Sequence, residues 1–377
     1  MGFQTFSSPY DWSRIDRYRR IVSAVPGGVA DLSVGSPVDP VPDSVQDALA
    51  RSADGKDAHG YPATIGSPVL RQALKDWFRS ERGVDLDSCG ASLLPTVGSK
   101  EAVSLMASLL HLGEGDVVVQ PAVSYPTYAI GTQLSGARVV TVDDPADVES
   151  WVSIPGVRAI WVNSPSNPTG AVLDTEDLAV IVRAARSIGA VVLSDECYAL
   201  LTWTPGGPAG KPAPCILDPE VCQGSADGLI CLYSLSKQSN MAGYRSAFMA
   251  GDPNLLGPMT TYRKQIGMII SGPVQAAMVA ALADRQEVRI QRDRYFRRLS
   301  ILVDALRSFG YQATMPQGGL YLWVRSRGGD CWEDMETLAS LGILPSPGEF
   351  YGDSSHLRLS TTVSDAVMDQ VADRLGS

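Results

Sequence analysis

The chain has 377 residues, of which 45% are hydrophobic, so it is long enough for two or more structural units with a large buried core. Its formal net charge is −10 and it has no basic block, which argues against nucleic acids and anionic membranes as partners. The six cysteines and three histidines lack metal-site spacing, no signal-like segment opens the chain, and no apolar run could span a bilayer; these features favour a soluble protein of the reducing cytoplasm without a metal site.

The first third of the chain carries two turn motifs and the start of a helix. Gly35 lies in a Leu-Ser-Val-Gly-Ser-Pro run, and Tyr61 lies in a Gly-Tyr-Pro run that taken alone predicts a surface turn. Residues 96–103 predict a loop that opens a helix, because apolar residues recur from there at helical spacing. A helix that begins after a glycine, here Gly98, presents free N–H groups and the positive end of its dipole. It can therefore bind an anion, with a plain helix cap as the alternative.

Three short apolar runs in the middle of the chain end in turn residues, which predicts buried parallel strands. The runs are 116–121, 157–162 and 190–193, and a helix is expected from 175 to about 189. Tyr125 and Tyr128 follow the first run, Asn167 follows the second, and Asp195 and Tyr198 follow the third. Ligands of open α/β sheets bind outside the carboxyl ends of the strands. The polar side chains are therefore expected to converge on one edge together with Lys237.

Lys237 lies in a run, 233–245, whose composition suits a phosphorylated aldehyde. Its amine can form an imine with the aldehyde, while the hydroxyls of Ser234 and Ser236 and the bidentate guanidinium of Arg245 can bind the phosphate. Pyridoxal phosphate is such a cofactor, and a protein that holds it needs a lysine and an acid that faces the pyridinium nitrogen. A lysine beside serines is by itself more often part of a solvated loop, so the prediction depends on further partners.

Residues upstream of Lys237 supply those partners. Asp195 can keep the pyridine nitrogen protonated, because a nearby negative charge favours the cationic form, and a protonated ring stabilises a substrate carbanion. Asn167 and Tyr198 can hydrogen-bond the phenolic oxygen of the ring. Taken alone, Asp195 would be a strand-end cap, Asn167 a turn residue and Tyr198 a half-buried aromatic. The order and spacing of the three residues together favour a cofactor site.

The last third of the chain predicts a long helix over 273–307, strands over 320–324 and 356–360, and a closing helix over 363–375. Residues 204–212, which precede the last third of the chain, are rich in glycine and proline and predict a flexible loop at the rim of the site. Arg358 stands among apolar residues of the second strand, where an arginine needs an anionic partner. A ligand carboxylate is the favoured partner, and an internal salt bridge is the alternative.

With these motifs in this order and at these separations, the chain resembles the fold-type I pyridoxal-phosphate aminotransferases of class I/II almost from end to end. The resemblance implies an α/β fold in which residues 46–284 form a large domain around a mostly parallel, seven-stranded sheet. Residues 246–250 would be the one antiparallel strand of this sheet. A smaller α+β domain would combine residues 1–45 and 285–377.

The resemblance also implies roles for the motifs. Lys237 would hold the cofactor as a Schiff base and shuttle the proton, with Asp195 at the ring nitrogen and Asn167 and Tyr198 at the phenolic oxygen. Tyr125, or alternatively Tyr128, would stack on the ring. The phosphate would be bound by Gly98, Ser99, Lys100, Ser234, Ser236 and Arg245, and by Tyr61 reaching across a homodimer. The α-carboxylate of the substrate would be bound by Arg358, with Asn167 and the backbone of Gly35 beside it.

Three runs, 33–42, 216–222 and 236–240, are similar to actinobacterial N-succinyldiaminopimelate aminotransferases, which use glutamate and 2-oxoglutarate as the amino couple in lysine and cell-wall precursor synthesis. This similarity implies ping-pong N-succinyl-LL-2,6-diaminopimelate:2-oxoglutarate transamination. The extra carboxylates of that substrate need a second cationic patch, for which the candidates are Arg14, Arg17, Arg19, Arg20, Arg263 and Lys264. The alternatives are an aminotransferase of aromatic or broad 2-oxo acid specificity, a pyridoxal-phosphate carbon–sulfur lyase and a non-catalytic regulator.

Overall fold

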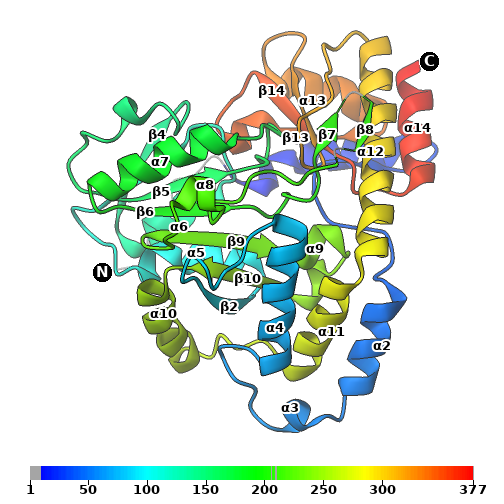
Figure 1. The fold of residues 1–377 in the computed structure, drawn as a ribbon. Coiled ribbons are helices and arrows are strands. Elements are labelled where there is room, and N and C mark those ends of the chain that lie inside the picture. Colours follow the sequence, from blue (N-terminus) through cyan, green and yellow to red (C-terminus); the bar gives the residue numbers. More distant parts are fainter. Residues whose placement is uncertain (1–9, 205, 209, 377) are drawn as a thin grey trace, which may run out of the picture.

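The computed structural model describes residues 10–204, 206–208 and 210–376 (Figure 1). Its largest sheet has seven strands in the order β2-β10-β9-β6-β5-β3-β4. These strands are β2 (Ser92–Val97), β3 (Val117–Pro121), β4 (Arg138–Val142), β5 (Val157–Asn163), β6 (Val191–Asp195), β9 (Leu229–Ser234) and β10 (Ser246–Gly251). β10 is antiparallel to its neighbours β2 and β9, and the other adjacent pairs are parallel. The predicted mostly parallel sheet, with its antiparallel strand at 246–250, is confirmed.

Helices cover both faces of this sheet. Alternate side chains of a strand project to opposite faces, so Trp161 and Leu193 enter one hydrophobic core and Ile160 and Val192 enter another. The first core includes α5 (Ser99–Leu109), α6 (Thr127–Ser135) and α10 (Pro253–Gln265), and the second includes α4 (Pro68–Trp77), α7 (Thr175–Ser187) and α11 (Gly272–Ala283). With its faces covered, the sheet offers a ligand the edge at the carboxyl ends of its strands.

Two helix boundaries show how local chemistry starts a helix. Helix α7 begins as predicted, where Asp174 and Asp177 form a capping box. The single helix predicted over 273–307 is wrong, because α11 and α12 (Arg285–Ser308) are separated at Asp284. The ψ angle of Asp284 is 75°, and its carboxylate accepts hydrogen bonds from the N–H of Glu287 (3.1 Å) and the hydroxyl of Ser44 (2.6 Å). Aspartate is a preferred N-cap, so a new helix starts there.

A second group of elements forms a hydrophobic core that joins both ends of the chain, with the orange and red segments beside blue ones in Figure 1. The group consists of α1 (Asp16–Ala24), β1 (Ala30–Asp31), α12, β11 (Tyr321–Arg325), α13 (Cys331–Ser340), β12 (Ile343–Leu344), β13 (Ser346–Pro347), β14 (His356–Ser360) and α14 (Asp365–Gly376). β14 pairs antiparallel with β11 and β13, and β1 pairs parallel with β12. The predicted strands and closing helix of this region are confirmed, whereas the domain boundaries at 45/46 and 284/285 stay a prediction.

The remaining α-helices and strands of the described residues are α2 (Asp43–Ser52), α3 (Lys56–His59), α8 (Pro219–Cys222), α9 (Leu235–Gln238) and the antiparallel pair β7 (Trp203–Thr204) and β8 (Gly207–Pro208). This pair lies within the loop predicted over 204–212, of which residues 205 and 209 lie outside the described residues. Helix α9 follows β9 directly and carries Lys237. Within the described ranges, a helix long and apolar enough to cross a membrane is not found.

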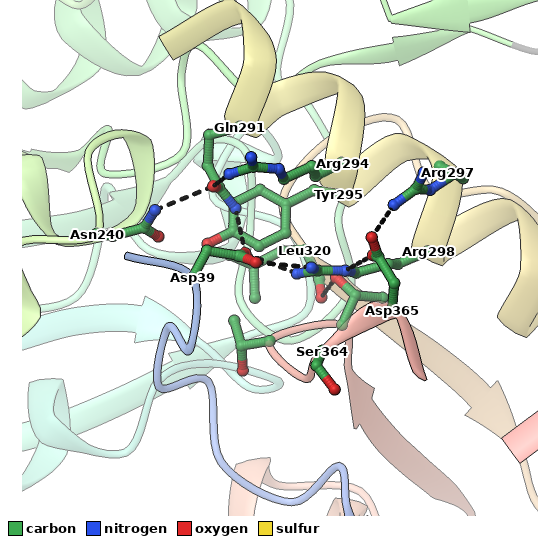
Figure 2. A network of polar contacts seen from close by, with 12 residues as sticks. Asp39, Asn240, Gln291, Arg294, Tyr295, Arg297, Arg298, Leu320, Ser364 and Asp365 are labelled. Carbon is green, nitrogen blue, oxygen red and sulfur yellow. Dashed lines mark hydrogen bonds and ion pairs between the residues drawn. The ribbon is translucent and has the colours of Figure 1, made fainter. Parts of the chain in front are cut away.

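A network of polar contacts ties the N-terminal segment to α12, to α14 and to the loop after Lys237 (Figure 2). Nη1 and Nη2 of Arg298 each donate to the carboxylate of Asp39 at 2.7 Å, and Nε donates to Asp365 at 2.7 Å. Gln291 donates to Asp39 at 2.9 Å and accepts a hydrogen bond from Asn240 at 2.9 Å. The side chains of Arg298 and Asp39 are both largely buried, so their paired, charge-assisted contact is little screened by solvent. The contacts of this network hold the segment that follows Gly35 beside the loop that follows Lys237.

Candidate active site

One cavity of about 270 Å³ brings most of the predicted site residues together. It lies where β5, β6 and β9 end and α5 begins. The predicted residues that line it are Gly35, Ser99, Lys100, Tyr125, Asn167, Asp195, Tyr198, Ser234, Ser236, Lys237, Arg245 and Arg358. Gly98 lies next to the guanidinium of Arg245. Tyr61 does not line the cavity; it lies between α3 and α4, with its residue surface 99% exposed.

Lys237, whose side chain is partly buried, places its amine in this cavity. Its Nζ donates a hydrogen bond to the carbonyl oxygen of Gly35. Burial, reinforced by the positive charge of Arg358, lowers the pKa of Lys237 to about 8, because a charged ammonium is poorly solvated there. A substantial fraction of the amine is therefore neutral near pH 8, and only the neutral amine can attack an aldehyde.

We expect the apoprotein to take up pyridoxal phosphate about tenfold faster at pH 9 than at pH 7, because the neutral fraction of an amine with a pKa of about 8 rises about tenfold over this interval. Stopped-flow absorbance of the apoprotein mixed with the aldehyde measures the rate. Pyridoxamine phosphate, which has no aldehyde, is the control and should bind without this rise. An uptake rate that still climbs steeply above pH 9 would show that the pKa of Lys237 is close to that of an ordinary lysine.

Asp195 is a buried acid at the end of β6. One carboxylate oxygen accepts a hydrogen bond from the hydroxyl of Tyr128 at 2.8 Å, and the other accepts from the N–H of Cys197 at 3.2 Å. Burial raises the pKa of Asp195, while these hydrogen bonds act in the opposite direction. A cationic group beside Asp195 would offset the unfavourable burial of its charge.

The two candidate stacking tyrosines have different surroundings. Tyr128 is buried, its ring lies 4.6 Å from that of Trp161 at an interplanar angle of 19°, and its hydroxyl is bound to Asp195. Tyr125 lines the cavity and meets the ring of Tyr128 edge-on at 5.6 Å. Tyr125 is therefore the residue available to a ligand ring, and Tyr128 instead supports Asp195.

The start of α5 forms an anion cradle with the loop after Lys237. Gly98, the residue before α5, has a φ of 79°, and a Cβ on it would lie 2.1 Å from Nη2 of Arg245. The glycine is thus required both by its backbone and by the guanidinium packed against it. Ser234 donates to the hydroxyl of Ser236 at 2.8 Å on the same cavity wall. Free N–H groups, hydroxyls and a guanidinium together suit a phosphate.

Arg358 carries a buried charge without a carboxylate partner among the described residues. Its Nη1 donates to Oδ1 of Asn167 at 3.0 Å, its Nη2 donates to the carbonyl of Ser33 at 2.7 Å, and its buried Nε has no hydrogen-bond partner. The rings of Tyr321 and Tyr351 lie 4.1 and 4.4 Å from its guanidinium carbon. The internal salt bridge considered from the sequence is not formed within these residues, which leaves the guanidinium for an anionic ligand.

Other residues of the cavity carry no recognisable sequence motif. Tyr10, Trp12, Asn163, Tyr321 and Tyr351 line it, and they come from distant parts of the chain. Asn163 ends β5, donates to the carbonyl of Asp195 at 2.8 Å and accepts from the N–H of Asn167 at 2.7 Å. Its position at the end of a predicted strand was the one signal that could have identified it.

A buried cluster that includes Glu196, the residue after Asp195, has potential metal ligands. Single ligand atoms of Glu196, Cys215 and Cys231 lie within 4.8 Å of one another. However, Glu196 is 2.7 Å from Nη2 of Arg82, both side chains are fully buried, and its other oxygen accepts a hydrogen bond from Ser194. The carboxylate is thus already neutralised by an arginine, and we interpret the group as a structural ion pair.

Comparison with known proteins places the chain in a family. A family model described as aminotransferase class I and II matches residues 28–375. The 4-dedimethylamino-4-oxo-anhydrotetracycline transaminase of Streptomyces rimosus is 42% identical over 368 residues, 97% of this chain and 98% of the relative. An LL-diaminopimelate aminotransferase of Dehalococcoides mccartyi is 30% identical over 357 residues, 91% of this chain and 89% of the relative. The crystal structure of an aminotransferase from Neisseria meningitidis has a TM-score of 0.84 at 29% identity, covering 98% of this chain and 97% of that one. The chain belongs to the class I and II aminotransferases, and its cofactor is pyridoxal 5′-phosphate.

Proposed function

We propose that this aminotransferase moves an amino group between an α-amino acid and a 2-oxo acid in ping-pong order, with Lys237 holding the cofactor and Arg358 binding the substrate carboxylate. The observation that carries the proposal is the presence, in one cavity, of an amine with a lowered pKa and a buried guanidinium that lacks a carboxylate partner among the described residues. The first suits an aldehyde, and the second suits the carboxylate that every α-amino acid carries.

The cavity residues fit pyridoxal phosphate. Asp195 is a buried acid that would pair with a ring nitrogen. Tyr198 and Asn167 line the same cavity and would offer polar atoms to the phenolic oxygen of the ring. The cradle at the start of α5, with Arg245 against Gly98, suits the phosphate. These features support roles for Asp195 and Tyr198 in catalysis alongside Lys237.

Pyridoxal phosphate, when bound, supplies an aldehyde that takes up the amino group and a ring that draws electrons from the reacting carbon. Lys237 Nζ, with its pKa near 8, can take a proton from that carbon and return it to the carbon on the other side of the amino nitrogen. Asp195, which is buried, would hold a counter-charge at the ring nitrogen. Arg358 orients the substrate through its carboxylate, so that the same proton faces Lys237 in each turnover.

We propose further that the distal group of the substrate is aromatic or another flat ring system. The aromatic residues of the cavity are Tyr10, Trp12, Tyr125, Tyr198, Tyr321 and Tyr351. Its cations are Lys100, Lys237, Arg245 and Arg358, and the last three have proposed roles toward the cofactor or the α-carboxylate. Tyr10 and Trp12 pack edge-on against each other at 5.7 Å and form an aromatic wall from the segment before α1. The S. rimosus relative, whose name specifies an oxo-anhydrotetracycline, supports a ring substrate.

The cations suggested from the sequence for distal carboxylates do not line the cavity of the described chain. Arg14 pairs with Glu349 at 2.7 Å, Arg19 with Asp16 at 2.8 Å, Arg263 with Glu101 at 2.5 Å, and Arg17 with Glu336. Arg20 and Lys264 are also absent from the lining. A distal carboxylate would therefore meet aromatic rings where it needs a positive charge.

N-succinyl-LL-2,6-diaminopimelate:2-oxoglutarate transamination, the reaction implied by the finer sequence similarity, is the second candidate. Its support is the identity of 30% with an LL-diaminopimelate aminotransferase, together with the three similar sequence runs. This candidate requires cations from outside the described cavity, such as those of a second copy of the chain.

A panel of amino acceptors tests the two candidates. With glutamate as donor, we expect kcat/KM for phenylpyruvate to exceed that for N-succinyl-2-amino-6-oxopimelate by about tenfold or more, the scale at which an apolar pocket discriminates. Trp12→Ala should lower kcat/KM for phenylpyruvate about tenfold, because a large ring contact is lost. Phe309→Ala is the control and should leave the ratio of the two acceptors unchanged, because Phe309 packs against Tyr311 and Arg327 outside the cavity lining.

The opposite order of acceptors would establish the second candidate. Release of pyruvate and ammonia from cysteine without any acceptor would instead identify a carbon–sulfur lyase.

We also propose that the enzyme is a homodimer whose sites are shared. Tyr61 is 99% exposed, and the nearby Ile65 and Val69 are also exposed, which supports contact with another molecule. Tyr61→Phe should weaken cofactor affinity about tenfold, because one hydrogen bond to a charged phosphate is lost. Equilibrium dialysis measures this affinity. A dimer with unchanged affinity, or a monomer with full activity, would contradict the shared site.

A further inference from the structure

Tyr321 lines the cavity, although no sequence motif predicts a role for it there. It begins β11, which pairs with β14, the strand of Arg358. Its ring lies 4.1 Å from the guanidinium carbon of Arg358, and its hydroxyl lies 3.2 Å from the hydroxyl of Tyr198. The two tyrosine rings meet edge-on, with centroids 5.8 Å apart. Tyr321 thus connects the carboxylate-binding arginine with the tyrosine at the cofactor.

Gly35 shows how closely the hydroxyl of Tyr321 is enclosed. A Cβ on Gly35 would lie 2.0 Å from the hydroxyl oxygen of Tyr321 and 2.8 Å from its Cζ. Because Gly35 has no side chain, the hydroxyl of Tyr321 can lie against its Cα without a steric clash. The carbonyl of the same glycine accepts the hydrogen bond from Lys237, so the hydroxyl is packed between the lysine's backbone partner and Tyr198.

We propose that Tyr321 is a positioning residue that donates a hydrogen bond to Tyr198 and thereby directs the single proton of Tyr198 toward the cofactor. A tyrosine hydroxyl has one proton to donate. If Tyr198 donates it to the phenolic oxygen of the ring, the contact between the two hydroxyls requires Tyr321 as its donor. A hydroxyl that accepts a hydrogen bond is also a stronger donor, and a buried environment increases this effect. This inference rests on the proposed role of Tyr198.

Tyr351 provides a matched control within the same cavity. Its ring also lies against Arg358, at 4.4 Å, but its hydroxyl lies 3.2 Å from the hydroxyl of Ser346. Replacement of either tyrosine by phenylalanine keeps the ring against the guanidinium. Only Tyr321→Phe removes the partner of Tyr198. The two variants therefore separate a role in positioning Tyr198 from a role in packing Arg358.

The test is a pH titration of the visible absorption band of the holoenzyme, which needs no turnover. A hydrogen bond donated to the ring oxygen favours its anionic form, so weaker donation moves the midpoint to higher pH. We expect Tyr321→Phe to raise the midpoint by about half to one pH unit, the equivalent of one neutral hydrogen bond. Tyr351→Phe should leave the midpoint unchanged. In a Tyr198→Phe background, Tyr321→Phe should add no further shift.

An unchanged midpoint in Tyr321→Phe, or an equal shift in both backgrounds, would overturn the inference. If Tyr321→Phe does not bind cofactor, Gly35→Ala displaces the same hydroxyl from the opposite side and should raise the midpoint in the same direction; no rise would again overturn it. A failure of the proposed function is distinguishable, because an enzyme whose Lys237 does not hold the cofactor would show no such band in the wild type.

Discussion

Replacing Lys237 with alanine is expected to abolish the visible absorption band of the bound cofactor and to lower kcat by about 10⁴-fold or more, the upper range for loss of a general acid–base group. The reason is that Lys237 supplies both the amine that holds the aldehyde and the group that moves the proton. Its burial, which lowers its pKa to about 8, suits both tasks. Absorbance spectroscopy and transamination of phenylpyruvate with glutamate as donor measure the two effects.

Two further variants make this result specific to Lys237. Lys237→Arg keeps a positive charge but cannot form the bond, because a guanidinium stays protonated, so it should also lack the band. Lys100→Ala removes the other lysine that lines the cavity and should keep the band. Turnover retained by Lys237→Ala, or loss of the band in Lys100→Ala alone, would show that a different amine holds the cofactor.

Replacing Arg358 with alanine is expected to raise the KM for the amino acid and to lower kcat/KM by about 100-fold, because charge-assisted hydrogen bonds contribute about 1.5–3 kcal/mol each. The guanidinium is held by Ser33 and Asn167 and by the rings of Tyr321 and Tyr351, so its orientation is preorganised for a carboxylate. Steady-state kinetics with glutamate measure the loss.

The matched comparison for Arg358 uses the substrate as well as the protein. An amine that lacks the α-carboxylate should react at the same low rate with the wild type and with Arg358→Ala. With this amine, neither enzyme can form the contact between Arg358 and a carboxylate. Arg358→Lys should recover part of the loss, since lysine keeps the charge but lacks the bidentate fork. Unchanged kinetics with glutamate, in a variant whose cofactor band is normal, would place the carboxylate site elsewhere.

Local patterns predicted the large sheet well. The runs 116–121, 157–162 and 190–193 are strands. Tyr125, Asn167, Asp195 and Tyr198, which follow them, line one cavity, because parallel strands bring their carboxyl ends to the same edge. The helix over 273–307 failed for a local reason too, since Asp284 interrupts an otherwise continuous pattern. The choice between Tyr125 and Tyr128 could not be made from local patterns, because it depended on the stacking of Tyr128 against the distant Trp161.

The sequence by itself determined which residue types stand at the strand ends, and hence the family and the cofactor, because strand period and turn chemistry act over a few neighbouring residues. Only the tertiary structure decided how distant side chains meet: the hydroxyl of Tyr321 with that of Tyr198, Arg358 with Ser33, and Arg14 with Glu349. Contacts between residues so far apart in the chain depend on how whole elements pack, and neither spacing nor periodicity records that packing. The aromatic wall of the cavity, and with it the proposed substrate class, belongs to this second kind of information.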